Sequence, residues 1–501
     1  ILIGLVGSEM CIRDRIYTSI NMSDNKNLLT EIAKRWKLDA KLEDTDRYFY
    51  SQNEVDDILS GEKCYVIGRK GTGKTAISEY LLKKANFKFS EKLSFKNFPF
   101  NELYSLSNTK YTAPNQYISI WKYLIYSFIC RMMICNEGIS SSLRAELAKA
   151  YGTDPITSLP RTVNTWTKKD FSLSLAGVIN AKFTNEAPEL EKLSWIERVN
   201  ILEDIIMGHL DKSSYYIIFD ELDEDYRDVT NKGEFEYYSN LITSLFKAVQ
   251  DIKSIFRNTD FNIYPVVFLR DDIYSLIKDS DKNKWSDFKV DLNWNEIKIK
   301  QMLAYRISRA HNLDGEILPF DKAWNLLFFR KDVPKGNQGK KMVNSFEFIS
   351  GSTHLRPRDF IRYIQVCAED TLTQGYKQIH PKTIKFVDKA FSNYLRDEIV
   401  DEIHALLPDI NNILQIISQI RKQTFTVTEF KEVYRSYLDA GTIKEKNIEY
   451  VLQTLYDFSV LGNQPKQKNN QIFRYLNREA RINFREQLVV HRGLFKSLQI
   501  L

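Results

Sequence analysis

The sequence predicts an α/β fold in which helices cover a mainly parallel sheet. Apolar runs with the length of buried strands occur at three places: 64–67, 215–219 and 263–269. Helical patterns separate them, at 74–84, 195–210 and 234–255. Parallel strands need a crossover connection, so this alternation is typical of a parallel sheet. A further strand is expected at 92–99 and helical structure at 28–60.

The most specific motif in the sequence joins the strand at 64–67 to the helix that begins near residue 74. Its letters, GRKGTGKT, fit the pattern GxxxxGK[ST], with a strand before it and a helix after it as the motif requires. Glycines in such a loop let backbone N–H groups surround a phosphate, and the start of the helix attracts negative charge. The motif predicts a nucleotide-binding P-loop made of Gly68, Arg69, Lys70, Gly71, Thr72, Gly73, Lys74, Thr75 and Ala76.

Four side chains are expected to act in the chemistry. Lys74 would reach the β- and γ-phosphates as a point charge, and the Thr75 hydroxyl would join the shell of a Mg²⁺ ion. The strand at 215–219 ends in a pair of carboxylates, Asp220 and Glu221. Asp220 is expected to hold Mg²⁺ and Glu221 to polarise the attacking water, which predicts hydrolysis rather than storage. A solvated acidic cap of the strand is the alternative interpretation.

The predicted nucleotide is ATP. Thr167–Asp170 does fit the [NT]KxD pattern of GTP-binding proteins. It precedes the strand that ends in Asp220, however, whereas GTPases carry this pattern on a later strand. We interpret the match as a coincidence.

Three arginines are further candidates for nucleotide contact. Arg270 directly follows the strand at 263–269, where a polar side chain could sense the γ-phosphate. Its alternative role is an ion pair with Asp271 or with the acidic residues at 220–225. Arg356 and Arg358 flank a proline that fits the first turn of a helix. The alternative for these two is an ordinary helix start whose arginines meet surface acids.

Several segments recur here in a fixed order: GRKGTGKTA, YYIIFDELDED, VVFLRDDIY, Trp294 shortly before Arg306, and LRPRDFIRYI. Together they resemble a family of bacterial P-loop ATPases related to the AAA+/STAND and origin-recognition branches, across 45–500 of this chain. The resemblance implies an ASCE-type parallel sheet. It also places Arg270 at the sensor-1 position, where a small polar residue is usual, and Arg358, ahead of Arg356, at the sensor-2 position of a lid.

The same resemblance implies an ATP-hydrolysing molecular switch that acts through a protein partner or a homo-oligomer, with defence against phage as one setting by family analogy. The alternative is a DNA-binding AAA+ ATPase of the replication-initiator or transposition type. A scaffold that keeps ATP bound without hydrolysis is a third hypothesis. Arg306 would act as an arginine finger in trans, or else be an arginine of a helix surface.

Four segments are predicted along the chain. Residues 6–15 resemble a translated sequencing adapter, so 1–21 are interpreted as an artefact or as disordered, with Met22 as the expected start. The remaining segments are a P-loop core, 22–294, with a helical insert at about 104–212 and a hairpin near 171–178; a wholly helical lid, 295–395; and a winged helix, 396–501.

The winged helix is expected to hold three helices and a two-stranded wing: 406–420, 427–438 and 446–458, then 460–463 and 471–476. The third helix carries several acids beside its lysines, so it would contact phosphates poorly. The basic wing residues Lys466, Lys468 and Arg474 are therefore the candidates for a DNA contact. A protein contact or an autoinhibitory role is the other possibility for this domain.

Composition places the chain among globular proteins. It has 501 residues, of which 43% are hydrophobic and 27% charged, and its net charge of +6 permits a nucleic-acid partner without requiring one. Five cysteines without a CxxC pair argue against a disulfide framework and favour a reducing cytoplasm. No apolar run approaches the ~20 residues that span a bilayer, so no membrane contact is expected.

Overall fold

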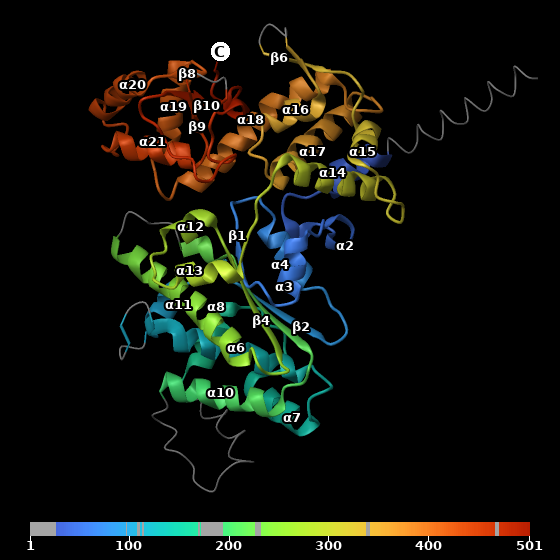
Figure 1. The fold of residues 1–501 in the computed structure, drawn as a ribbon, viewed down its shortest axis with the longest axis vertical. Helices are drawn as coiled ribbons and strands as arrows, with labels where there is room; N and C mark the ends of the chain where they lie inside the picture. The colour runs from blue at the N-terminus through green and yellow to red at the C-terminus, as the bar shows by residue number, and fades with distance from the viewer. Residues whose placement is uncertain are drawn as a thin grey trace, which may run out of the picture. The chain divides into compact units, whose positions relative to one another are not determined.

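The computed structural model describes most of the chain: residues 27–96, 98–107, 111–112, 115–168, 171, 194–225, 232–336, 341–465 and 470–500. These residues form two compact units, coloured along the chain in Figure 1. The sheet unit contains Ser51–Lys70 and Lys74–Leu292. The C-terminal unit contains the described residues up to Tyr50, the three residues Gly71–Gly73, and Asn293 onward.

The sheet unit is built on five strands: β1 (Tyr65–Ile67), β2 (Lys88–Ser94), β3 (Ser214–Asp220), β4 (Asn262–Leu269) and β5 (Lys289–Asp291). Their spatial order is β2-β3-β4-β1-β5, and every neighbouring pair is parallel. After β1 the chain passes through α4 (Lys74–Leu81) to β2 at the far edge of the sheet. This is an α/β P-loop NTPase fold with a helical C-terminal part, as the sequence predicts.

Two strand predictions need correction. The strand expected at 92–99 is β2, which begins at Lys88 and ends at Ser94. The fifth strand, β5, was not predicted at all. Only its central residue, Val290, is buried, so β5 is too short and too exposed at both ends to show an apolar pattern.

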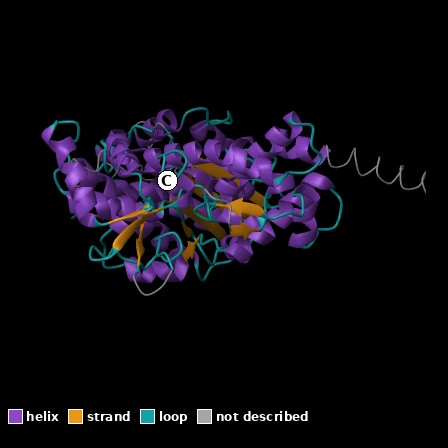
Figure 2. Ribbon diagram, turned by 90° about the horizontal axis from the view of Figure 1, so that it is seen from above, coloured by secondary structure: helices purple, strands orange, loops and turns teal. Residues whose placement is uncertain are grey.

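Helices account for most of the described residues, as the purple ribbons of Figure 2 show. Those of the sheet unit, besides α4, are α3 (Asn53–Leu59), α5 (Phe100–Tyr104), α6 (Ile118–Ile134), α7 (Ser141–Tyr151), α8 (Leu159–Thr167), α10 (Trp195–His209), α11 (Lys232–Phe256), α12 (Asp271–Leu276) and α13 (Lys282–Trp285). Four of them, α6, α7, α8 and α10, lie in the predicted insert. The hairpin expected near 171–178 lies outside the described residues except for Phe171, as does Asp170 of the GTP-like pattern.

The apolar helix α6 lies in the core of the sheet unit. Trp121 donates its indole N–H to the carbonyl of Leu241 at 2.9 Å, and its ring meets Phe219 of β3 edge-on. Twelve of the 17 side chains of α6 are buried, which explains a composition with so few charges. Among the described residues, no helix has both the length and the apolar character required to cross a membrane.

The C-terminal unit is mainly helical. Its helices cover 27–35, α2 (Thr45–Tyr48), α14 (Glu296–His311), α15 (Phe320–Leu327), α16 (Ser345–Ser350), α17 (Pro357–Thr373), α18 (Pro381–Ile403), α19 (Ile410–Ile420), α20 (Val427–Asp439) and α21 (Ile448–Asp457). The prediction of a wholly helical lid is wrong. An antiparallel pair, β6 (Val333–Lys335) and β7 (Lys341–Val343), interrupts it, because three-residue strands leave no detectable alternation in the sequence.

The predicted wing also needs correction. The first wing strand is β9 (Leu461–Gln464), and it pairs along its length with β10 (Gln487–Val490). The predicted second strand, 471–476, contributes a single antiparallel bridge to β9, between Ile472 and Asn463. A third short strand, β8 (Thr424–Phe425), pairs with the other edge of β10. The apolar residues of 471–476 that suggested a strand are used differently: Phe473 and Tyr475 pack their rings against His491.

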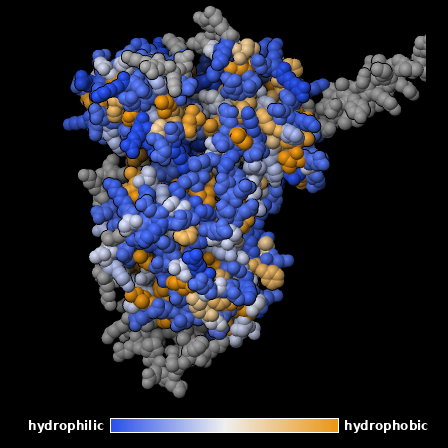
Figure 3. Space-filling view, in the orientation of Figure 1, coloured by the Kyte–Doolittle hydropathy of each residue, from blue (hydrophilic) through white to orange (hydrophobic). Residues whose placement is uncertain are grey.

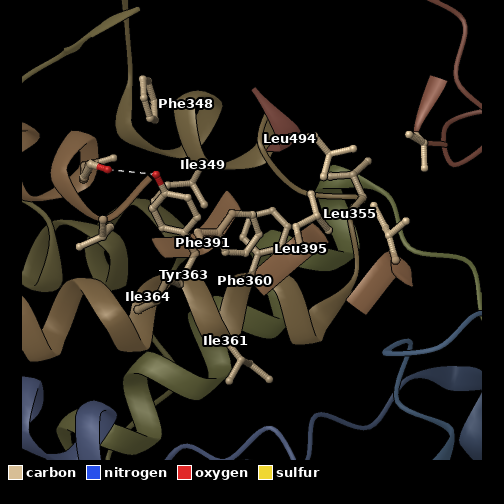
Figure 4. Close-up of a cluster of buried hydrophobic side chains, with 14 of the residues drawn as sticks. Phe348, Ile349, Leu355, Phe360, Ile361, Tyr363, Ile364, Phe391, Leu395 and Leu494 are labelled. Carbon is tan, nitrogen blue, oxygen red and sulfur yellow. Dashed lines mark hydrogen bonds between the residues drawn. The ribbon is translucent and has the colours of Figure 1, made fainter. Parts of the chain in front are cut away.

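One continuous apolar core fills the C-terminal unit. Figure 4 shows its centre, where Phe360 and Tyr363 of α17 face Phe391 and Leu395 of α18. The hydroxyl of Tyr363 donates to the carbonyl of Ile384 at 3.0 Å. Full burial of such a side chain stabilises the fold by roughly 1.5–3 kcal/mol.

The start of the described chain belongs to this core. Trp36 is fully buried and Tyr48 nearly so, and both pack in the same cluster as α14 and α17. The residues up to Tyr50 therefore fold with the C-terminal unit, whereas the sequence assigned them to the P-loop core.

On the face drawn in Figure 3, apolar surface is scattered among hydrophilic residues.

Candidate nucleotide-binding site

The loop from Gly68 to Gly73 leaves β1 at the carboxyl end of a central strand. The N–H of Gly68 still donates to the carbonyl of Leu269 in β4 (3.2 Å), after which the loop turns away from the sheet. Gly71 and Gly73 have φ angles of 81° and 100°, a region that favours glycine. A Cβ at Gly73 would meet no atom within 4 Å, so the loop borders open space there.

Lys74 begins α4 and folds back over the loop. Its ammonium donates to the carbonyls of Gly68 (2.7 Å) and Arg69 (3.0 Å). It makes no ion pair with any described residue. Burial lowers the pKa of Lys74; Arg270 also lowers it, while the carboxylates of Asp223 and Asp271 oppose the shift. A partly buried cation whose hydrogen-bond partners are carbonyls is suited to receive an anion such as phosphate.

The two predicted carboxylates lie at the end of β3. Asp220 is buried, accepts the N–H of Glu221 at 2.9 Å and forms an ion pair with Lys92 at 3.0 Å. Glu221 has a φ of 59°, a conformation that costs free energy for a residue with a side chain. Its carboxylate accepts a hydrogen bond from the hydroxyl of Ser94.

Lys92 and Ser94 are residues of this site that the sequence did not reveal. The register of β2 against β3 places Ser94 opposite Asp220, and Lys92 lies two residues earlier on the same face. Burial alone would lower the pKa of Lys92, but Asp220 and Glu79 outweigh burial and raise it. A strand placed correctly at 88–94 would have shown these two polar residues on one face of an edge strand.

Arg270 follows β4, as predicted, and faces acidic side chains. Its guanidinium bonds Asp272 through Nε (3.0 Å) and Nη2 (2.6 Å), and Nη1 lies 3.5 Å from Asp223. The alternative ion-pair interpretation named Asp271; the structure instead shows Asp272, together with one member of the acidic run. A role for Arg270 in sensing phosphate stays a prediction.

The two lid arginines differ. Arg356 is fully buried and bonds Asp359 (3.0 Å) and Glu402 (2.6 Å). Burial would lower the pKa of Arg356, but these two carboxylates raise it above its ordinary value. Arg358 keeps part of its surface exposed and makes a longer ion pair with Glu398, at 3.3 Å.

Within the C-terminal unit, the tip of the P-loop contacts the lid. The indole N–H of Trp294 donates to the carbonyl of Thr72 at 2.9 Å. The backbone N–H of Arg358 donates to the carbonyl of Gly71 at 3.4 Å. A Cβ at Gly71 would lie 3.2 Å from the Cβ of Arg358. Glycine at this position therefore permits the close approach as well as the positive φ.

These residues fit a magnesium nucleotide. The open space beside Gly73 and the carbonyl-held ammonium of Lys74 suit phosphate oxygens. Thr75 and Asp220 supply the hard oxygen ligands that Mg²⁺ prefers. Asp220 already faces one cation, Lys92, so its buried carboxylate is arranged for positive charge.

Other predicted residues lie elsewhere. Lys466 and Lys468 fall outside the described residues. Arg474 is described, and it forms an ion pair with Asp457 of α21 at 2.9 Å. Arg306 is neither an exposed finger nor a surface arginine, since it is buried and paired with Glu43 at 2.5 Å.

A glycine-rich loop between β1 and α4, with paired carboxylates at the end of β3, is the arrangement of a P-loop NTPase fold. Residues 297–400 match the model of the FunZ-associated C-terminal helical domain. That match covers the lid and leaves the larger part of the chain outside it. No curated protein matches the sequence.

Solved structures of origin-recognition proteins resemble the chain over most of its length. The Aeropyrum pernix ORC2 protein, in ADPNP and ADP complexes, is 12% identical with a TM-score of 0.40 and 89% of each chain covered. The Aeropyrum pernix ORC1 protein in complex with DNA is 11% identical with a TM-score of 0.36, covering 92% of this chain and 96% of that one. Drosophila ORC bound to DNA is 10% identical with a TM-score of 0.27, covering 91% and 90%. Identity and TM-score are low, so the function is argued from this chain's own residues.

Proposed function

We propose that this chain is an ATPase that binds ATP with Mg²⁺ in the P-loop and hydrolyses it. The observation that carries the proposal is Lys74, a partly buried ammonium bonded to two loop carbonyls and to no carboxylate among the described residues. Thr75 and Asp220 would hold Mg²⁺. When bound, Mg²⁺ would neutralise charge on the phosphates of the transferred group.

Each nearby residue then has a defined task. Lys74 stabilises charge on the β- and γ-phosphates, and Glu221 accepts a proton from the attacking water. In this structure Ser94 holds the carboxylate of Glu221 by a hydrogen bond. That bond has to be exchanged for the water before Glu221 can act as a base. Arg270 would exchange its acidic partners for the γ-phosphate.

The lid is proposed to pass the nucleotide state onward. Trp294 and Arg358 contact the tip of the P-loop, so a change of that loop on binding phosphate would be felt at the starts of α14 and α17. Arg358, rather than the buried Arg356, is the proposed lid contact to nucleotide. The output is proposed to reach a partner protein or further copies of this chain.

The experiment compares wild type with Lys74→Ala and Glu221→Gln. We expect Lys74→Ala to lose ATP binding, and Glu221→Gln to keep it while turnover falls about 10²–10⁴-fold. Phosphate release and equilibrium binding of a fluorescent ATP analogue separate the two. Light scattering with and without ATP reports the oligomeric state. Phosphate release by Lys74→Ala at the wild-type rate would refute the proposed site.

A second candidate is an ATPase associated with DNA, of the replication-initiator or transposition type. The order α19-β8-α20-α21-β9-β10 favours it, because this order is typical of a winged helix. The charges of α21 support DNA binding less clearly, because two of its acidic residues lie beside cations. Glu449 lies 3.8 Å from Lys431, and Asp457 pairs with Arg474. Duplex binding that weakens with salt and is lost on Lys466→Glu with Lys468→Glu would support this candidate.

A further inference from the structure

The C-terminal unit carries exposed aromatic rings that the nucleotide site does not use. Segments 327–331 and 376–380 run side by side: the N–H of Phe329 donates to the carbonyl of Ile379 at 3.0 Å, and that of Ile379 to Leu327 at 2.9 Å. This pairing stacks Phe329 on His380, with centroids 4.6 Å apart and planes 20° from parallel. Tyr376 contacts the same imidazole at 5.0 Å. We name Phe329, Tyr376 and His380 the ring platform.

The rings keep much of their surface in water. Phe329 is 42% exposed and Tyr376 46% exposed, while Phe386, one turn along α18 from Lys382, is 73% exposed. Packing among themselves covers only part of these rings. Exposed apolar surface gathered in one place is typical of a binding site rather than of ordinary surface.

Cations surround the ring platform. Arg330 and Lys331 follow Phe329, Lys377 follows Tyr376, and Lys382 and Lys385 follow His380; all are exposed. None of these five forms an ion pair with a residue in the described part of the chain. Asp332 is the one acidic residue in 327–332 and 376–386. These two segments therefore carry five cations against one acidic residue.

A hollow of about 720 Å³ opens beside the platform. Phe329, Arg330 and Lys331 line it together with the rings of Trp324 and Phe346. Four carboxylates line it as well: Glu296, Asp321, Asp332 and Glu347. Trp324 is nearly buried and bonds Ser345 through its indole N–H at 2.8 Å, so the floor of the hollow is fixed. Rings therefore continue from the platform into this recess, but its carboxylates disfavour phosphate, so the proposed surface is the platform outside it.

We propose that this surface binds single-stranded nucleic acid. Unpaired bases offer flat faces that stack on aromatic rings, while the phosphates that join them require positive charge at intervals. Rings and cations alternate in this way along 329–331 and 376–386. A duplex hides its base faces, and an acidic peptide has the charge without the flat rings, so neither matches both features. This function is additional to ATP hydrolysis and does not depend on it.

The test uses the full chain without nucleotide and a fluorescein-labelled 20-mer of mixed-sequence single-stranded DNA, read by fluorescence anisotropy. Phe329→Ala and Tyr376→Ala are each expected to weaken binding about tenfold. Lys382→Glu with Lys385→Glu is expected to weaken it further and to reduce the salt dependence. The mutated side chains are exposed, and thermal unfolding followed by circular dichroism checks that each variant is folded.

Two controls match these changes. Phe87→Ala removes a ring that is 79% exposed beside lysines of the sheet unit, and Lys444→Glu with Lys446→Glu alters the charge of the winged-helix segment. Unchanged affinity in both controls, with loss in the platform variants, supports the proposal. It is overturned if wild type does not bind, if the ring variants bind as wild type, if the controls lose as much affinity, or if a duplex of the same sequence competes better than the single strand.

Discussion

Two cations that the sequence assigned to one nucleotide lie in opposite environments. Lys74 of the sheet unit bonds two backbone carbonyls, and burial lowers its pKa. Arg356 of the C-terminal unit bonds two carboxylates, which raise its pKa although burial acts in the other direction. The first is arranged to gain an anion; the second is already neutralised. The hydrogen-bond and ion-pair partners of a cation near a P-loop therefore indicate whether it can bind a ligand or stabilises the fold. Its position in the sequence does not distinguish these two roles.

The largest expected effect separates these two cations by stability. Arg356→Met leaves Asp359 and Glu402 buried without a counterion, which costs about 3–5 kcal/mol of unfolding free energy. Lys74→Met removes a cation whose burial is not compensated by a carboxylate, so the nucleotide-free protein is expected to lose less than about 1 kcal/mol. Urea unfolding without nucleotide measures both. Equal losses in the two variants would contradict the comparison.

The sequence predicts the Lys74 environment better than that of Arg356 for a physical reason. Gly68–Thr75 is contiguous, so its backbone conformation and its site are encoded in one stretch. The neutrality of Arg356 depends on Glu402, which the core of α17 and α18 brings close from 46 residues away. Lys92 and Ser94 were missed because their role follows from the register of β2 against β3. β5 was missed because it is a short strand with polar residues at both ends, and β10 because its place depends on pairing with β8 and β9.

A third cation, Lys92, tests the comparison from inside the nucleotide site. Lys92→Met leaves the buried Asp220 without its ion-pair partner and is expected to cost about 2 kcal/mol. Mg²⁺ bound at Asp220 would replace the missing charge, so Mg²⁺ should stabilise this variant more than wild type. Thermal unfolding with and without Mg²⁺ measures the difference. Lys212→Met, which breaks an exposed pair with Asp260, is the control and should respond to Mg²⁺ as wild type does.

Arg358 should behave unlike its neighbour Arg356. Its ion pair with Glu398 is long and partly exposed, so Arg358→Ala is expected to change the unfolding free energy by less than about 1 kcal/mol. As the proposed lid contact, it should instead lower ATP turnover severalfold. Phosphate release and urea unfolding on the same preparation test both statements. A loss of unfolding free energy as large as that of Arg356→Met would show that Arg358 stabilises the fold, as Arg356 does.

The smallest effect concerns pH and Lys74 itself. Burial lowers the pKa of Lys74 below the ordinary lysine value of 10.5. At alkaline pH below 10.5, part of the nucleotide-free protein therefore carries a neutral amine at this residue. Nucleotide phosphates favour the charged form, so ATP binding takes up a proton there and ATP affinity falls as pH rises. The free protein changes in the opposite sense: its folded state binds fewer protons at this group than the unfolded chain, so rising pH stabilises it. Calorimetry of ATP binding in two buffers of different ionisation enthalpy counts the proton. Lys74→Arg, which stays charged throughout this range, should lose that uptake; uptake equal to wild type would assign the proton to another group.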